Sequence, residues 1–119
     1  MCGINGIISK DKNKDKLIKS MNEKILHRGP DAEGIFVEGD VALGQRRLSI
    51  IDLAGGNQPI YNEDKSILIM YNGEVYNYKE LKEELTEYEF QTNSDTEVIL
   101  HGYEKWGKEL PKKLRGMFA

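Results

Sequence analysis

The sequence lacks the features that mark disulfide-bonded, membrane-spanning and secreted proteins. It contains a single cysteine, and its longest uninterrupted apolar run is Ile67–Tyr71. One cysteine excludes an internal disulfide, which is typical of proteins kept in a reducing compartment. The apolar run is far too short to cross a bilayer, and no apolar segment of a secretory signal follows the amino terminus. We therefore expect a cytoplasmic protein with no membrane partner.

The chain also lacks an excess of charge of either sign. Lys and Arg number 17 against 20 Asp and Glu, which gives a net charge of -3 at pH 7. The two signs are interspersed, so no basic stripe could follow a phosphate backbone, and nucleic acid is not an expected partner. At 119 residues the chain is long enough for one domain, and we treat residues 1–119 as a single unit.

Motifs for nucleotides and metals are missing as well. The phosphate loop Gly-x-x-x-x-Gly-Lys-Ser/Thr is absent, so this segment is not expected to bind ATP. The charged run Asp11–Lys16 is expected to be a solvated loop. It offers oxygen ligands, but it lacks the glycine and the final carboxylate of a calcium loop. His27 and His101 form no zinc spacing with Cys2. We expect no metal ion here, and we expect His101 to be a surface residue or a satisfied buried one.

Hydrophobic periodicity predicts a mixed α/β (α+β) fold of short strands and helices. Strands are expected at Ile4–Ser9, Ile35–Glu38, Val41–Leu43, Arg47–Ile51, Ile67–Tyr71 and Arg115–Ala119. Helical spacing joins Leu17, Ile18, Met21 and Ile25, then Tyr78, Leu81 and Leu85, and then Val98, Leu100, Tyr103 and Trp106. Gly39-Asp40 predicts a two-residue type II′ hairpin turn between two of the strands.

Polar residues mark the ends of the two later helices. Asn77 with Glu80, and Ser94 with Glu97, have the spacing of capping boxes, and Gly107 is expected to end the last helix. The strand expected at Arg115–Ala119 opens where the sequence stops. We therefore expect the chain to be the N-terminal part of a longer domain, incomplete at its C-terminus.

Cys2 directly follows Met1. Removal of the methionine would leave a thiol and a free α-amine on the same carbon, and an ordinary α-amine has a pKa of roughly 7.7 to 8.0. Such an amine can take the thiol proton and later return it to a leaving group, as an amino-terminal nucleophile requires. Gly3 and Gly6 interrupt the first strand, which often marks close approach of a ligand or another backbone. The alternative is a small residue at a frayed terminus.

Asn72-Gly73 follows the apolar run and has two interpretations. Asn-Gly between strand-like segments is a strong signal for a hairpin turn. The functional alternative is an oxyanion hole, because an Asn amide and a Gly N–H can direct two donors at one developing negative charge. The local sequence leaves both open.

Arg47 and Asp95 could bind the two charges of a free α-amino acid. A guanidinium on a rigid strand would pair with the carboxylate in a bidentate manner. Asp95 would accept the ammonium group. Each residue also has a structural interpretation, since paired arginines are often solvated and a carboxylate is favourable at a helix N-terminus.

Six motifs follow one another along the chain and resemble a known family when taken in order. They are Cys2-Gly3-Ile4-x-Gly6, His27-Arg28-Gly29-Pro30-Asp31-x-x-Gly34, Arg47-Leu48-Ser49-Ile50-Ile51-Asp52, Gln58-Pro59, Asn72-Gly73-Glu74-Val75-Tyr76-Asn77 and Ser94-Asp95-Thr96-Glu97. Together they resemble the glutaminase domain of glutamine-hydrolysing asparagine synthetases, which are class II glutamine amidotransferases. Gln45 departs from the pattern, because many relatives carry histidine there.

The resemblance implies a fold and a set of roles. The fold would be the Ntn-hydrolase four-layer αββα sandwich of antiparallel sheets. Cys2 would be the nucleophile, with its α-amine as the base, and Asn72 and Gly73 would hold the oxyanion. The implied glutamine-binding residues are Arg47 for the α-carboxylate, Glu74 and Asp95 for the α-amino side, and Leu48, Ser49, Ile50, Ile51, Asn72 and Gly73 along the pocket.

The resemblance also implies a reaction and partners. Glutamine would be hydrolysed to glutamate through a Cys2 glutamyl thioester, and the ammonia would pass to a synthetase domain that is absent from this sequence. That domain would use ATP and magnesium to make asparagine from aspartate, whereas this segment would need no cofactor. Two alternatives remain open: a non-catalytic glutamine-binding fragment, and a related amidotransferase with another acceptor. A homodimer is also left open.

Overall fold

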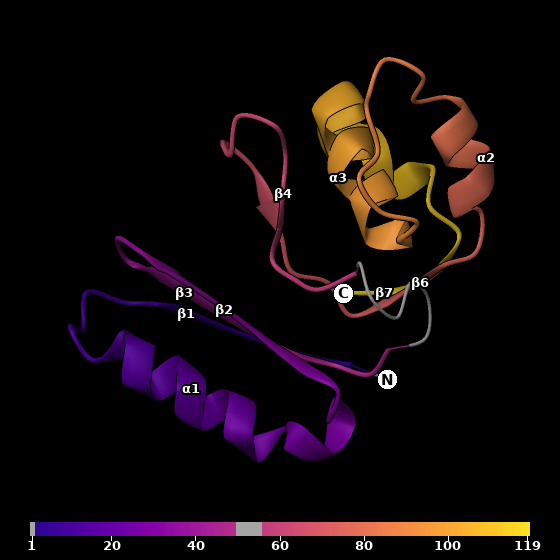
Figure 1. The fold of residues 1–119 in the computed structure, drawn as a ribbon. Coiled ribbons are helices and arrows are strands. Elements are labelled where there is room, and N and C mark those ends of the chain that lie inside the picture. The colour runs from indigo at the N-terminus through magenta and orange to yellow at the C-terminus, as the bar shows by residue number, and fades with distance from the viewer. Residues whose placement is uncertain (1, 50–55) are drawn as a thin grey trace.

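The computed structural model describes residues 2–49 and 56–119 (Figure 1). It combines helices with small antiparallel sheets, as expected for a mixed α/β protein. The elements are β1 (Gly3–Ile8), α1 (Lys14–Lys24), the 3₁₀ helix η1 (Leu26–Arg28), β2 (Ala32–Glu38), β3 (Val41–Arg47), β4 (Ile60–Tyr61), β5 (Leu68–Ile69), β6 (Gly73–Val75), α2 (Tyr78–Glu83), α3 (Asp95–Trp106), the 3₁₀ helix η2 (Gly107–Lys112) and β7 (Gly116–Phe118).

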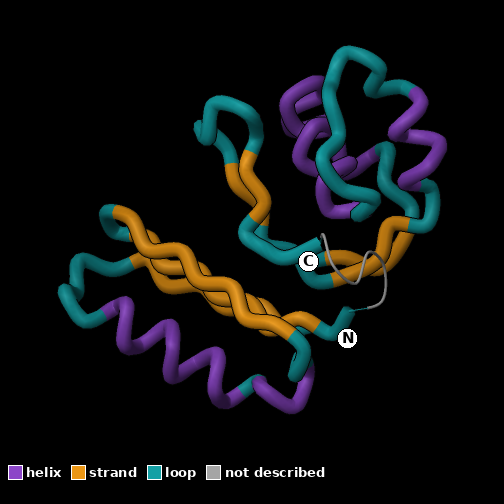
Figure 2. Tube along the Cα trace, in the orientation of Figure 1, coloured by secondary structure: helices purple, strands orange, loops and turns teal. Residues whose placement is uncertain are grey.

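The first region of the chain is a three-stranded antiparallel sheet covered on one face by α1 (Figure 2). The strands lie in the order β1-β3-β2. The β2–β3 hairpin closes through Gly39-Asp40, where Glu38 pairs with Val41 and Gly39 has a φ of 54°. Because only the first of the two turn residues has a positive φ, the turn has the type II′ pattern predicted from the sequence.

Helix α1 packs on this sheet through Ile18 and Asn22, both fully buried. Gly44 of β3 allows the close approach, since a Cβ there would lie 2.5 Å from the Asn22 side-chain oxygen. Two expectations were wrong. The helix begins at Lys14, inside the segment expected to be a charged loop, and Leu17 is exposed instead of facing the sheet.

The second region packs two helices around a small core. Its fully or nearly buried members are Tyr71, Val75, Leu81, Leu85 and Val98. The Ser94 side chain caps α3 by accepting a hydrogen bond from the Thr96 N–H at 3.1 Å, and Gly107 ends the helix with a φ of 53°. Both features were predicted. Tyr103, which was expected to face apolar partners, lines an apolar pocket with Ile69 and Leu100 but remains 46% exposed.

Two of the expected strands are wrong. Arg47 ends β3 instead of starting a new strand, because β2 begins at its pairing partner Ala32 and the ladder reaches no further. Of the remaining expected strand residues, Ile50 and Ile51 lie outside the described part of the chain. The run Ile67–Tyr71 is no central strand either, since only the two residues of β5 are strand and they pair with β4 alone.

The expected capping boxes also differ. The Asn77 side chain donates to the Lys113 carbonyl and accepts from the Arg115 N–H, both at 2.9 Å, so it anchors the approach to β7 instead of capping α2. The Glu97 carboxylate accepts from the N–H groups of Gln91 and Thr92 instead of from Ser94. The strand predicted at the end of the sequence is present as β7, which pairs with β6.

Candidate active site

A pocket lies where the ends of β1 and β3 meet the start of β6 and the N-terminus of α3. It therefore joins the two regions of the molecule. Its lining consists of Cys2, Arg47, Leu48, Gly56, Gln58, Tyr71, Asn72, Gly73, Glu74, Ser94, Asp95 and Thr96. Seven of the residues expected in a glutamine site are among them: Cys2, Arg47, Leu48, Asn72, Gly73, Glu74 and Asp95.

Strand β3 places its two neighbouring arginines on opposite faces, because side chains alternate along a strand. Arg46 binds the Gly29 carbonyl at 3.0 Å and lies 3.7 Å from Glu33, away from the pocket. Arg47 lines the pocket, is only 5% exposed, and donates to the Asn57 side-chain oxygen at 3.1 Å. The alternative that Arg47 is a solvated surface residue is therefore wrong.

Cys2 is held by the main chain of Leu48. The Leu48 N–H donates to the Cys2 sulfur at 3.2 Å, and the thiol lies 3.5 Å from the Leu48 carbonyl oxygen. Arg28 donates from Nε to the Cys2 carbonyl at 3.1 Å. These contacts fix the sulfur at the pocket wall, which contradicts the alternative of a frayed terminal residue.

Of the remaining residues of the expected Leu48–Ile51 wall, only Ser49 lies in the described part of the chain. Among the described lining residues Ser49 does not appear, and its N–H is bound to the Asp31 carboxylate at 2.8 Å. Ile50 and Ile51 lie outside the described residues.

Asn72-Gly73 begins a strand and is not a hairpin turn. Asn72 and Ala119 exchange both main-chain hydrogen bonds, at 3.0 and 2.8 Å, and Gly73 is the next position of the β6–β7 ladder, opposite Phe118. In an antiparallel ladder, hydrogen-bonded and non-hydrogen-bonded pairs alternate, so the Gly73 N–H points away from β7. It is thus directed to the same side as the Val75 N–H, which reaches Asp95.

The Asn72 side chain has an unusual environment. Its Oδ1 is buried and has no hydrogen-bond partner among the described residues. Buried polar atoms are nearly always paired, so an unpaired one in a pocket wall needs an explanation. A ligand in the pocket would supply that explanation. The oxygen and nitrogen of an amide are assigned from the partners that surround them, so with a ligand present the amide nitrogen can take this position and donate to it.

Asp95 closes the other end of the Asn72–Glu74 segment. Its Oδ2 accepts from the Val75 N–H at 2.9 Å and from the Tyr71 hydroxyl at 3.2 Å, and the residue is 5% exposed. Burial raises the pKa of the Tyr71 hydroxyl, and the negative charge of Asp95 raises it further, so Tyr71 remains a donor. The second carboxylate oxygen, Oδ1, is then the atom that a ligand in the pocket could reach.

Local sequence reasoning missed five lining residues: Gly56, Gln58, Tyr71, Ser94 and Thr96. Gln58 shows why. Its Oε1 accepts from the Tyr71 N–H at 2.6 Å, and its Nε2 donates to the Thr96 hydroxyl at 3.4 Å. The only sequence signal was the Gln58-Pro59 motif, which says nothing about a contact that reaches α3.

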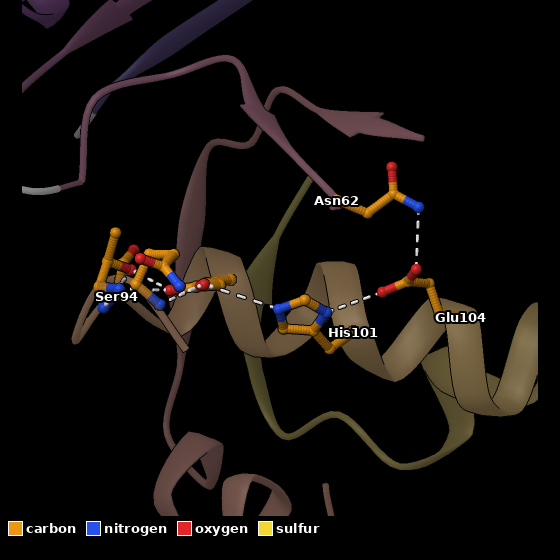
Figure 3. A network of polar contacts seen from close by, with 7 residues as sticks. Asn62, Ser94, His101 and Glu104 are labelled. Carbon is orange, nitrogen blue, oxygen red and sulfur yellow. Dashed lines mark hydrogen bonds and ion pairs between the residues drawn. The ribbon is translucent and has the colours of Figure 1, made fainter. Parts of the chain in front are cut away.

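A polar network runs along α3 from the Ser94 end to Glu104 (Figure 3). His101 is 3% exposed and lies between two carboxylates, with Nδ1 2.7 Å from Glu104 and Nε2 3.6 Å from Glu97. Glu104 also accepts from the Asn62 amide at 2.8 Å, which ties α3 to the end of β4. The expectation of a satisfied buried histidine is confirmed.

Metal and membrane features can be stated for residues 2–49 and 56–119. These residues contain no group of three or more His, Cys, Asp and Glu side chains arranged to hold a metal ion. None of the helices they form is both long and apolar enough to cross a membrane.

Comparison with known proteins gives one consistent result. A family model described as a glutamine amidotransferase domain matches residues 1–119. The chain is 49% identical over 126 residues to the glutamine-hydrolysing asparagine synthetase 1 of Bacillus subtilis, and it covers 20% of that protein. It is 45% and 43% identical over 122 residues to the corresponding enzymes of Zea mays and Asparagus officinalis, covering 21% of each. All of this chain is matched in each case, so it spans about a fifth of the length of these relatives.

Proposed function

Because the chain belongs to the glutamine amidotransferase domain family, we propose that it hydrolyses glutamine to glutamate and ammonia with Cys2 as the nucleophile. The observation that carries this proposal is the convergence of a thiol, an arginine, two carboxylates and the Asn72-Gly73 donors on one pocket. These groups come from separate parts of the sequence, and a purely structural role for each would not require them to meet.

Glutamine binding would use the charges on opposite sides of the pocket. Arg47 would pair with the α-carboxylate, and its contact with Asn57 holds the guanidinium in one orientation. Oδ1 of Asp95 and the carboxylate of Glu74 would accept the α-ammonium group. With both ends of the amino acid fixed, the side-chain carboxamide is directed to Cys2, which raises the effective concentration of the reacting groups.

The chemistry would begin with removal of Met1, which frees the α-amine of Cys2. That amine takes the thiol proton, and the thiolate attacks the carboxamide carbon. The negative charge that forms on the carboxamide oxygen is bound by the Asn72 amide and the Gly73 N–H. The α-ammonium group returns the proton to the leaving nitrogen, ammonia departs, and water hydrolyses the glutamyl thioester to glutamate and free thiol.

We also propose that the complete domain is the four-layer αββα sandwich of the Ntn hydrolases. Support comes from the antiparallel pairing of every described sheet and from the arrangement in Figure 1, where α1 covers one face of the β1-β3-β2 sheet and the α3 region lies beyond the opposite face. The nucleophile then sits at the end of a sheet strand between the two halves.

In the whole protein, ammonia would serve ATP-dependent synthesis of asparagine from aspartate. This rests on the relatives, which are glutamine-hydrolysing asparagine synthetases. A synthetase domain of the same polypeptide would be the partner and would hold ATP and magnesium. A related amidotransferase with another acceptor is the second candidate. Formation of asparagine from aspartate, ATP and glutamine distinguishes the two.

The direct test is glutamate release by the wild-type protein and by Cys2→Ala. We expect the substitution to reduce the rate by at least about a thousandfold, because deletion of a nucleophile removes the whole covalent route. The intact mass should also be lower by one methionine. Equal rates for the two proteins would exclude Cys2 as the nucleophile.

A further inference from the structure

The main chain of Tyr71 is held by two glutamine side chains. The Oε1 atom of Gln58 accepts from the Tyr71 N–H at 2.6 Å, and the Nε2 atom of Gln45 donates to the Tyr71 carbonyl at 3.2 Å. Both main-chain polar groups of this residue are therefore satisfied by side chains, although Tyr71 lies between the short strands β5 and β6.

The two glutamines come from different regions. Gln45 belongs to β3, two positions before Arg47, and is 1% exposed. Alternation along β3 places it on the face that looks toward the second region, where it reaches Tyr71 across 26 residues of sequence. Gln58 lies ahead of β4 and also contacts Thr96 at the start of α3.

Tyr71 immediately precedes the two donors that the proposed mechanism needs. Asn72 has main-chain bonds only to the terminal residue Ala119 among the described contacts, and its side-chain oxygen is unpaired. The position of the Asn72 amide and of the Gly73 N–H is therefore set by the pairing of β6 with β7 on one side and by the two contacts that hold Tyr71 on the other. The opposite end of the segment is held by Asp95 through Val75.

We propose that Gln45 is a positioning residue for the oxyanion donors Asn72 and Gly73, acting through the main chain of Tyr71 together with Gln58. This rests on the proposed glutamine hydrolysis. Gln45 does not line the pocket in the described structure, so it does not act by touching the substrate. A buried carbonyl that loses its donor shifts to find another partner, and such a shift moves the next two residues with it.

The proposal predicts a particular kinetic signature. The donors bind charge that exists only in the transition state, so a misplaced oxyanion hole lowers kcat and leaves glutamine binding unchanged. For Gln45→Met, which keeps the volume and removes the donor, we expect kcat to fall about 10- to 100-fold, since misplacement by about 1 Å costs about a hundredfold. KM should stay within about twofold of wild type.

Three further measurements separate positioning from a general loss of structure. Gln45→His keeps an N–H donor at similar reach and should recover most of kcat. The rate at which iodoacetamide alkylates Cys2 should be unchanged in Gln45→Met, because that displacement forms no oxyanion. Gln91→Met is the matched control at an exposed glutamine outside the pocket, and its kcat should equal that of wild type.

The outcomes are distinct. Unchanged kcat in Gln45→Met, or a rise in KM with kcat retained, overturns the positioning role while glutamine hydrolysis stands. Should Gln45→Met fail to fold, Gln58→Met on its half-buried loop removes the other contact to Tyr71, and unchanged kcat there overturns the proposal. If the wild-type protein releases no glutamate, the proposed function itself fails.

Discussion

The two regions that meet at the pocket are built in different ways. In residues 2–49, strands of six and seven residues form continuous main-chain ladders, and a helix covers them. In residues 56–119, the strands have two or three residues and the chain path is completed by side chains that bind main-chain groups. The nucleophile and Arg47 thus sit on a regular sheet, whereas the oxyanion donors sit on a segment positioned by individual polar contacts.

This difference has a consequence for substitution. In the first region many ladder hydrogen bonds hold the main chain of the sheet, so substitution of one side chain should leave the main chain of that sheet in place. In the second region, one side chain can set the course of the main chain, as Asp95 does for Val75 and Asn77 does for Arg115. We expect substitutions of pocket residues in the first region to change activity and leave the local main chain in place. In the second region, substitution of a side chain that binds the main chain should change stability as well.

Of the substitutions that test this difference between the two regions, Asn72→Ala should have the largest effect, which is on kcat. Loss of one oxyanion donor should reduce kcat about 100- to 1,000-fold. Stability should change little, because Oδ1 is already unpaired among the described residues. Steady-state glutaminase kinetics and urea unfolding measure the two quantities. A kcat equal to that of the wild type would show that Asn72 does not bind the oxyanion.

Arg47→Lys tests whether the regular sheet contributes function and not only structure. A lysine cannot reproduce the guanidinium fork, so KM for glutamine should rise about 10- to 100-fold, as expected for loss of a hydrogen bond to a charged group. Arg46→Lys, on the opposite face of the same strand, is the matched control and should leave KM unchanged. Equal effects at the two positions would contradict the assignment of Arg47 to the substrate.

His101→Leu probes the support of α3. Removing the imidazole leaves Glu97 and Glu104 facing each other without the group between them, and we expect the free energy of unfolding to fall by about 1 to 3 kcal/mol. The exposed pair of Lys112 and Glu109 offers a control, because Lys112→Ala should change stability by less than about 1 kcal/mol. Urea unfolding of both variants gives the two changes in the free energy of unfolding. Equal losses would mean that burial of the network adds nothing.

Asn77→Ala should give the smallest effect. Its side chain makes two hydrogen bonds, to Lys113 and Arg115, and their loss should cost about 1 to 2 kcal/mol. Asn13 stands at the start of α1 as Asn77 stands at the start of α2, and it is exposed, so Asn13→Ala should cost less than about 0.5 kcal/mol. If Asn13→Ala were the more costly change, the contrast between the two regions would not hold.

In both regions, the features predicted correctly from the sequence are those that depend on residues close together along the chain. The β2–β3 turn at Gly39 and the cap of α3 at Ser94 depend on residues two to four apart, and local pattern finds them. The path around Tyr71 depends on contacts from Gln58 and Gln45, 13 and 26 residues away. No local pattern contains such contacts, so Ile67–Tyr71 was expected to be a strand.

The candidate site shows the same limit. Local sequence left a turn and an oxyanion hole equally open for Asn72-Gly73, because the strand that excludes the turn is β7, more than 40 residues later. The chemistry of individual residues made Cys2, Arg47, Asn72, Gly73 and Asp95 candidates, and the resemblance carried by the six motifs added Leu48 and Glu74; all seven line the pocket. Thr96 and Gly56 were missed as contacts because their role depends on packing between the two regions.

Formation of the Cys2 thioester is tested by the mass of the N-terminal peptide after the protein is mixed with glutamine and quenched with acid. The proposed mechanism predicts a peptide that begins at Cys2 and carries one glutamyl group on its sulfur. A peptide that still begins at Met1, or that stays unmodified while glutamate accumulates, would show that the thiol at this position does not form the intermediate.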